Sequence, residues 1–318
     1  MADDDGYARR RPAKVCQRSR AMSVLTPYVP EDFDEFWRET VEEAESAPLE
    51  FQRSGTNDYL RSGFKVETLK FRGIDGTSRN GWIAYPVDAH RAPGFLWVPP
   101  YGRWSMSPND YGTREGFVSL SFNFFGEGAF HEEAYVPKRG YFAEGAARPE
   151  TFVFRRMFQD SLIALRVLEA QSEADEDRLS AMGLSQGGGM AIWLGAWCKQ
   201  VKCVAADYPF LAAMPWVLAQ RIFRYPLKEL TDFADSLPLG REVVGHTLSY
   251  FDTVNHATRC QVPTLVSLGL KDPAVRPEQV RAVHEALAGH KELAEIESGH
   301  DWHPCMIERN RDWLLKWL

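Results

Sequence analysis

The chain has 318 residues, of which 44% are hydrophobic and 25% are charged, a balance that is ordinary for a globular protein. Its formal net charge of −7 speaks against a broad polyanion-binding surface, and therefore against a nucleic-acid-binding protein. No apolar run reaches the roughly 18 residues that a membrane-spanning helix needs, so the sequence predicts no membrane segment.

Residues 1–22 differ from the rest of the chain. Three acidic residues are followed by six basic ones with almost no apolar content, and no hydrophobic stretch follows, which argues against a secretory signal. This composition predicts a disordered, solvated tail; a nucleic-acid-binding arm is the weaker alternative. Because a well-organised segment follows Met22, we expect Met22 rather than Met1 to be the natural start. Residues 23–318 are expected to form one domain.

The cysteines form no regular framework. Their odd number and loose scatter predict reduced thiols and a cytoplasmic location. No cysteine or histidine cluster has the spacing of a zinc site. The five are Cys16, Cys198, Cys203, Cys260 and Cys305.

The segment after Pro30 has helical periodicity, and Asp32 is placed to cap the helix. Apolar residues recur there on one helix face, at Phe33, Phe36, Trp37 and Val41. Next, the alternating segments 63–71 and 81–86 flank a run of turn-forming residues. They predict an N-terminal antiparallel hairpin.

Short apolar runs of strand length then recur at 94–98, 117–122, 179–184, 203–208 and 264–270. Helical segments lie between several of them and after the last, notably 158–170, 187–198, 277–288 and 307–318. This alternation predicts an α/β fold with a mostly parallel sheet and helices on both faces. Residues 209–250 break the alternation and predict a helical insert, either a lid or an assembly surface.

The sharpest motif is Gly183-Leu184-Ser185-Gln186-Gly187, between an expected strand and an apolar helix. GxSxG in this setting is typical of the nucleophile elbow of α/β-hydrolases, where small residues let a strained turn present the serine hydroxyl. The helix that follows offers free N–H groups to negative charge near Ser185. A glycine-rich turn with a bystander serine is the alternative interpretation.

A serine hydroxyl needs a base, and in this fold the acid and then the histidine follow the serine in the chain. Asp272 comes directly after the strand 264–270, and His300 follows the strand-like segment 292–297. Both residues are therefore expected at the same edge of the sheet as Ser185. Asp272 could instead be a turn or capping residue. Asp301 is the nearest rival acid, but a neighbour of the histidine cannot easily reach its Nδ1.

The chain resembles the acetyl-xylan esterase / cephalosporin-C deacetylase family of carbohydrate esterases from about Val29 to the C-terminus. The resemblance rests on seven sequence segments: PEDFDEFW, GWIAYP, GLSQGG, DYPFL, TLSYFDTVNHA, GLKDPAVRP and GHDW. It implies a Ser185–Asp272–His300 triad and an oxyanion hole formed by the backbone N–H groups of Gln186 and Tyr101. It also implies deacetylation of small acetylated sugars and cephalosporin C, and assembly as a homo-oligomer, commonly a hexamer.

The chain departs from the family pattern at three places, and the changes predict altered polarity near the site of a divergent member. Pro99-Pro100 replace His-Gly, Phe125-Gly126-Glu127 replace Arg-Gly-Gln, and Asp301 replaces Glu after the histidine.

Together these features predict a serine esterase that hydrolyses short-chain, chiefly acetyl, esters of small molecules through an acyl-enzyme, without a metal or organic cofactor. Two alternatives stay open: another hydrolase acting on a lactone, thioester, amide or non-sugar ester, and a non-catalytic binding protein on the same scaffold. Aromatic residues expected around the site are candidates for the wall of a small acyl pocket, although such residues are more often core: Trp104, Phe124, Phe125, Phe210 and Trp216.

Overall fold

The computed structural model describes residues 25–220, 222 and 224–318. The predicted tail and the choice between Met1 and Met22 lie outside these residues. The strands are β1 Phe51–Gly55, β2 Phe64–Arg72, β3 Ser78–Pro86, β4 Ala92–Val98, β5 Val118–Asn123, β6 Ala174–Leu184, β7 Val201–Asp207, β8 Thr264–Gly269 and β9 Lys291–Ile296. The helices are α2 Phe33–Ser46, η1 Pro149–Thr151, α3 Val153–Glu169, α4 Gln186–Trp197, α5 Met214–Leu218, α6 Leu227–Asp235, α7 Gly240–Phe251, α8 Thr253–Ala257, α9 Pro277–Ala286 and α10 Cys305–Trp317.

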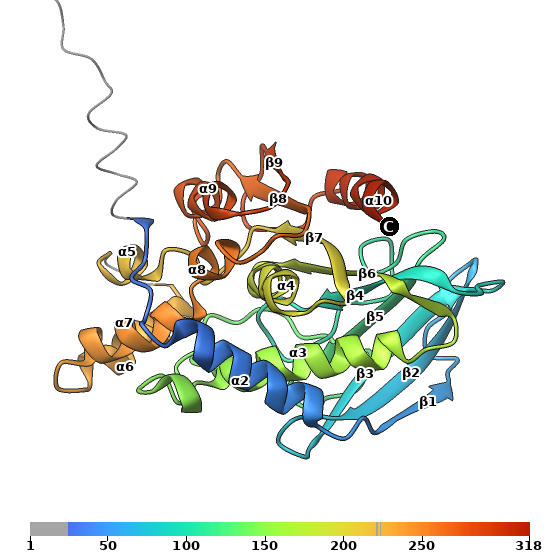
Figure 1. Ribbon diagram of the computed structural model, residues 1–318, viewed down its shortest axis with the longest axis horizontal. Helices are drawn as coiled ribbons and strands as arrows, with labels where there is room; N and C mark the ends of the chain where they lie inside the picture. Colours follow the sequence, from blue (N-terminus) through green and yellow to red (C-terminus); the bar gives the residue numbers. More distant parts are fainter. Residues whose placement is uncertain (1–24, 221, 223) are drawn as a thin grey trace, which may run out of the picture.

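Across the described residues the strands form one sheet in the order β1-β2-β3-β5-β4-β6-β7-β8-β9 (Figure 1). The pairs from β1 to β5 are antiparallel, and every pair from β5 to β9 is parallel. The predicted α/β fold with an antiparallel N-terminal part is confirmed. Strand β1 was not predicted, because as an exposed edge strand it lacks the alternation of buried and exposed residues that marked its neighbours.

Side chains of one strand alternate between two apolar layers, one on each face of the sheet. Leu96 and Val98 of β4 belong to a core that includes α2, α3, α4 and α9. Phe95 and Trp97 belong to a second core, which α10 covers with Trp313. Because both faces are covered, the central strands are almost continuously apolar, which is why they could be recognised in the sequence.

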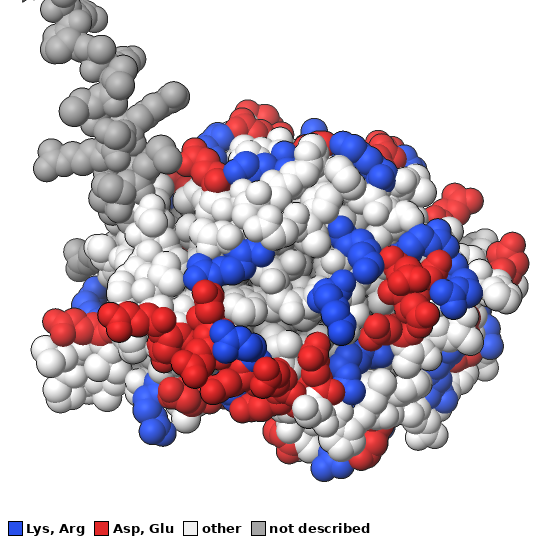
Figure 2. Space-filling view, in the orientation of Figure 1, with Lys and Arg blue, Asp and Glu red and all other residues white. Residues whose placement is uncertain are grey.

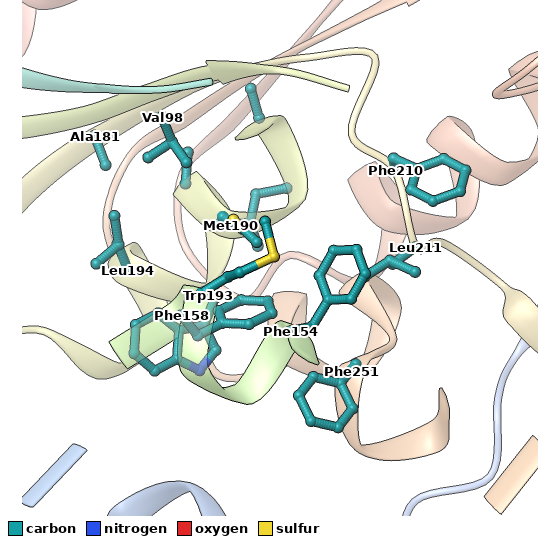
Figure 3. Close-up of a cluster of buried hydrophobic side chains, with 14 of the residues drawn as sticks. Val98, Phe154, Phe158, Ala181, Met190, Trp193, Leu194, Phe210, Leu211 and Phe251 are labelled. Carbon is teal, nitrogen blue, oxygen red and sulfur yellow. The ribbon is translucent and has the colours of Figure 1, made fainter. Parts of the chain in front are cut away.

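Helix α4 contributes Met190, Trp193 and Leu194 to the larger core, and all three are buried (Figure 3). The ring of Phe158 in α3 lies 4.9 Å from that of Trp193, edge to face. Trp37 of α2 packs 5.4 Å from Trp193 and 5.2 Å from Phe158, so the three rings contact one another. Helix α4, which follows Ser185, is thus packed tightly against α2 and α3.

Helix α2 has the predicted buried face and the predicted N-cap residue, but the side chain of that residue does not cap the helix. Asp32 stands at the N-cap position without a capping hydrogen bond. Its carboxylate accepts a hydrogen bond from the hydroxyl of Tyr250 instead. The Trp37 indole also donates to the Tyr250 carbonyl, at 2.9 Å, so α2 is tied to the distant helix α7. The outer face of α2 carries a band of acidic side chains (Figure 2).

Helices α5, α6 and α7 lie between β7 and β8 in the chain, where the sequence predicted a helical insert. They gather at one end of the molecule, opposite the antiparallel strands (Figure 1). The boundaries of the domain and of the insert as separate units remain a prediction. None of the helices in the described part of the chain is both long and apolar enough to span a bilayer.

Candidate active site

Ser185 stands in a strained turn between β6 and α4, with φ 57° and ψ −116°. The flanking glycines are required by close approach. A Cβ on Gly183 would lie 2.3 Å from the carbonyl carbon of Gly187, and one on Gly187 would lie 2.0 Å from the carbonyl oxygen of Val98. The turn is therefore packed against the end of β4, in the geometry expected of a nucleophile elbow.

The structure brings Ser185, His300 and Asp272 into one line of contacts. Asp272 follows β8 and places Oδ2 2.7 Å from Nδ1 of His300. The other ring nitrogen of His300, in the loop after β9, lies 2.9 Å from the Ser185 hydroxyl. Because a carboxylate only accepts, the ring donates from Nδ1, which leaves Nε2 to accept the Ser185 proton.

Both carboxylate oxygens of Asp272 accept hydrogen bonds. The Asp272 side chain is buried, and its Oδ1 accepts from the N–H groups of Ala274 at 2.7 Å and Val275 at 2.9 Å. It is therefore a turn residue and the partner of His300 at once. Asp301, the rival acid, is exposed, and its carboxylate accepts from the Trp302 N–H.

Two residues at the end of β7 support this side of the site. The Tyr208 ring lies 5.9 Å from that of His300, and its hydroxyl is 2.6 Å from the hydroxyl of Ser298, just before the histidine. Burial raises the pKa of Tyr208 to about 12, so the hydroxyl stays protonated. The preceding Asp207 accepts the Ser185 N–H at its carbonyl, at 2.8 Å.

The two predicted oxyanion donors lie on segments that touch. Gln186 is the first residue of α4, where backbone N–H groups have no partner within the helix. Tyr101 follows β4, whose last carbonyl lies against Gly187. The Tyr101 carbonyl accepts from the Trp104 indole at 3.2 Å. The segments that carry the two predicted donors therefore meet beside the elbow.

A further tyrosine links these two segments, and no motif had pointed to it. Tyr141 accepts the Gly102 N–H at 3.1 Å and donates to Oε1 of Gln186 at 2.9 Å. Its side chain is buried, which raises the pKa of the hydroxyl. It lies in a long loop without regular pattern, so only the structure reveals it.

The loop that carries Tyr141 is held by the insert. Glu229 of α6 accepts from the N–H groups of Gly140 at 2.6 Å and Phe142 at 3.0 Å. Its carboxyl is almost wholly buried, and burial raises its pKa. Nothing in the sequence pointed to the role of Glu229 either, because an acidic residue on a short helix is usually part of a solvent-exposed face.

The predicted pocket aromatics occupy different places. Phe210 lies beside the elbow, since its N–H donates to the Ser185 carbonyl at 2.9 Å. Trp104 contacts the Tyr101 carbonyl, as described above. Phe124 is 1% exposed and packs on Phe122 in the core. Trp216 is partly exposed in the insert, under the guanidinium of Arg276.

Phe125 stands where the resemblance leads us to expect an arginine, and two arginine side chains from elsewhere lie against its ring. The guanidinium of Arg103 lies 4.6 Å from its ring centre and that of Arg156 lies 5.3 Å away. Its ring also packs 4.4 Å from that of Tyr141. Glu127 accepts from Arg103 at 3.3 Å. The Phe125 ring therefore lies against two guanidinium groups, each of which is also paired with a carboxylate.

Comparison with protein families shows where this arrangement belongs. The sequence profile of the acetyl xylan esterase family, AXE1, matches residues 24–318. The chain belongs to the acetyl xylan esterase family. The resemblance noted in the sequence is thereby confirmed.

Individual members of the family and of related ones are distant in sequence. Acetyl esterase Axe7A of Xylanibacter ruminicola is 23% identical over 292 residues, which cover 88% of this chain and 65% of that protein. The chain thus spans somewhat less than two thirds of Axe7A. A probable 2-oxo-3-(5-oxofuran-2-ylidene)propanoate lactonase of Bradyrhizobium sp is 23% identical over 238 residues, covering 73% of this chain and 82% of the lactonase.

Solved structures in the family agree closely in fold. An acetyl xylan esterase from Paenibacillus sp. R4 superposes with a TM-score of 0.80 at 25% identity, covering 94% of this chain and 99% of that one. Acetyl xylan esterase 1 from Thermoanaerobacterium sp. JW/SL YS485 gives a TM-score of 0.80 at 23% identity, covering 94% and 98%. The family fold therefore extends over nearly the whole chain.

Proposed function

We propose that this protein is a serine esterase that removes acetyl and other short acyl groups from small molecules, including acetylated sugars. The observation that carries the proposal is the chain of contacts from Asp272 through His300 to Ser185, 2.7 Å and 2.9 Å long. Membership of the acetyl xylan esterase family supports the acetyl ester as substrate.

In the first half of the proposed reaction, Ser185 attacks the ester carbonyl while Nε2 of His300 takes its proton. Buried Asp272 holds the ring in the correct tautomer and stabilises the imidazolium. The backbone N–H groups of Gln186 and Tyr101 bind the oxyanion of the tetrahedral intermediate, a contribution of about 3–4 kcal/mol per donor in comparable enzymes. His300 then protonates the departing alcohol, and the acyl group stays on Ser185.

In the second half, water attacks the acyl-enzyme and His300 takes the proton from that water. The second tetrahedral intermediate collapses, His300 returns the proton to Ser185, and the carboxylic acid leaves. The same two N–H donors stabilise both tetrahedral intermediates, and His300 carries the transferred proton in each half of the reaction.

The test is turnover of p-nitrophenyl acetate together with labelling by a fluorophosphonate probe. We expect the wild-type chain to hydrolyse the ester and to be labelled at Ser185, and Ser185→Ala to lose both. Activity in Ser185→Ala refutes the nucleophile. A folded wild-type chain that is neither active nor labelled favours the non-catalytic binding protein instead.

Lactone hydrolysis is the second candidate, because one relative is named as a probable lactonase. The same triad opens a lactone by the same steps, but the alcohol stays on the acyl chain. Parallel assays of acetylated xylooligosaccharides, p-nitrophenyl esters of increasing chain length, and simple lactones separate the two. A preference for lactones of at least tenfold in kcat/KM would replace the esterase assignment.

Assembly and location are proposed from the sequence. The family resemblance supports a homo-oligomer, with a hexamer as the size to test by light scattering after size-exclusion chromatography. The scattered cysteines support a cytoplasmic location, and the four that the structure describes are free thiols. Fractionation of cells that express the full chain tests the location.

A further inference from the structure

The two donors of the proposed oxyanion hole lie 85 residues apart in the chain, on the Tyr101 loop and on α4. Binding of a developing oxyanion demands that both N–H groups point to one place before the reaction begins. Gln186 is held by the rigid helix that it starts. The Tyr101 loop lies outside the sheet and needs other contacts to fix it.

Tyr141 supplies such a contact to both segments at once. Its hydroxyl accepts the Gly102 N–H at 3.1 Å and donates to the Gln186 side chain at 2.9 Å. Its ring also packs 4.9 Å from the Tyr101 ring. One buried hydroxyl therefore ties the loop after β4 to the first residue of α4.

The peptide group that follows the Tyr101 donor is clamped from both ends. Its carbonyl oxygen accepts from the Trp104 indole at 3.2 Å, and its N–H, that of Gly102, donates to Tyr141. Gly102 has φ +135°, and a Cβ there would lie 2.3 Å from the Trp104 indole nitrogen, so this position requires glycine. Loss of the Tyr141 hydroxyl would release one end of the clamp.

Tyr141 itself is positioned from the insert. Glu229 accepts from the N–H groups on either side of it, those of Gly140 and Phe142. A buried carboxylate that takes two backbone N–H bonds is a strong anchor. The contacts therefore run from α6 through Tyr141 to the segments that carry the oxyanion donors.

We propose that Tyr141 is a positioning residue for the oxyanion hole, aligning the Tyr101 and Gln186 donors, and that Glu229 of the insert anchors it. This inference rests on the proposed function. It gives the insert a part in positioning the oxyanion donors, through one buried hydroxyl. It also gives the glutamine after the nucleophile a role for its side chain as well as for its N–H group.

The test is Tyr141→Phe, which removes the hydroxyl and keeps the ring. Its matched control is Tyr250→Phe, which removes another buried tyrosine hydroxyl, the one that donates to Asp32. Both variants and the wild-type chain are assayed with p-nitrophenyl acetate and with an alkyl trifluoromethyl ketone. The Ser185 oxygen adds to the carbonyl carbon of the ketone, and the carbonyl oxygen becomes an oxyanion bound in the oxyanion hole. The affinity for the ketone therefore reports how well the two N–H donors are aligned.

We expect Tyr141→Phe to lower kcat about 10-fold to 100-fold, since removal of one donor outright costs roughly 10²–10³ and here the donors are only misaligned. KM should stay within about twofold, and the ketone should bind more weakly by a factor close to the loss in kcat/KM. Tyr250→Phe should match wild type in both assays. Gln186→Met breaks the same bridge from its other end while keeping the backbone donor, and should reproduce the effect in weaker form.

The outcomes separate cleanly. Unchanged kcat and ketone affinity in a folded Tyr141→Phe overturn the inference alone, as does an equal loss in Tyr250→Phe. If Tyr141→Phe does not fold, full activity and ketone affinity in Gln186→Met overturn it. A wild-type chain that neither hydrolyses the ester nor binds the ketone overturns the proposed function, and this inference with it.

Discussion

The two sides of Ser185 are built in different ways. On the His300 side, Asp272 and His300 each lie within a few residues of the end of a strand, and those strands, β8 and β9, are parallel neighbours. On the donor side, Tyr101, Tyr141 and Glu229 come from a loop, a second loop and the insert, and side-chain hydrogen bonds join them. Sheet topology therefore places the first side, while a polar network places the second.

This difference predicts different responses to substitution. On the His300 side, His300 carries the proton and Asp272 orients and stabilises its ring, so the loss of either side chain disables proton transfer. On the donor side the side chains act through backbone groups, so their loss shifts those groups and leaves the chemistry weaker. The substitutions below test that division, in order of decreasing effect.

Asp272→Asn should have the largest effect. The Asn carbonyl can keep the hydrogen bonds to Ala274 and Val275, but its amide then faces Nδ1 of His300 and favours the wrong tautomer. We expect kcat for p-nitrophenyl acetate to fall about 10⁴-fold. The melting temperature should change little, because the turn is preserved. A loss of less than tenfold would show that Asp272 is a turn residue only.

The sequence predicted the His300 side well, and the reason is topological. Parallel strands end at one edge of the sheet, so a residue just after β8 and another just after β9 are placed by the strand pattern alone. The residues of the donor side could be predicted from the sequence only in part. The resemblance named Gln186 and Tyr101 as donors, and that role remains a prediction. Tyr141, by contrast, lies in an irregular loop whose path depends on long-range contacts.

The same limit explains the errors in the fold. The apolar central strands were recognised because burial on both faces leaves a continuous pattern. Strand β1 was missed because an exposed edge strand carries no such pattern. Asp32 was assigned as a cap from its position, but Tyr250, 218 residues away, competes for its carboxylate. Local propensity predicts where a helix begins, and tertiary partners decide which hydrogen bonds its side chains make.

Gly187→Ala should have an intermediate effect, since it moves the elbow as a whole. Its Cβ would lie 2.0 Å from the Val98 carbonyl oxygen, so the elbow and the end of β4 must separate. We expect kcat/KM to fall about 10²-fold, the scale of a misplacement near 1 Å. Gly55→Ala is the control, because a Cβ at that edge position meets no atom within 4 Å. Equal activity of the two variants would contradict the close packing of the elbow.

Glu229→Gln should have a smaller effect. The amide keeps one acceptor for the N–H groups of Gly140 and Phe142 and loses the other. One backbone hydrogen bond contributes about 1 kcal/mol, so we expect kcat to fall by less than about tenfold. Glu242→Gln, at an exposed position of α7 in the same insert, is the control and should match wild type. A loss in kcat as large as that of Asp272→Asn would place Glu229 in the chemistry itself and break the division drawn above.

Asp301→Asn should have the smallest effect, although it changes the residue next to the proposed base. Its exposed carboxylate accepts from the Trp302 N–H, while Nδ1 of His300 is already occupied by Asp272. An Asn carbonyl can accept the same bond, so we expect kcat/KM within about twofold of wild type, since surface substitutions away from buried networks rarely exceed about 0.5 kcal/mol. The double variant Asp272→Asn/Asp301→Asn should then be no worse than Asp272→Asn alone. If Asp301→Asn alone removes most activity, or if the double variant loses much more than Asp272→Asn, the two acids share the work of orienting His300. Proximity in sequence would then matter as much to this side of Ser185 as the order of the strands.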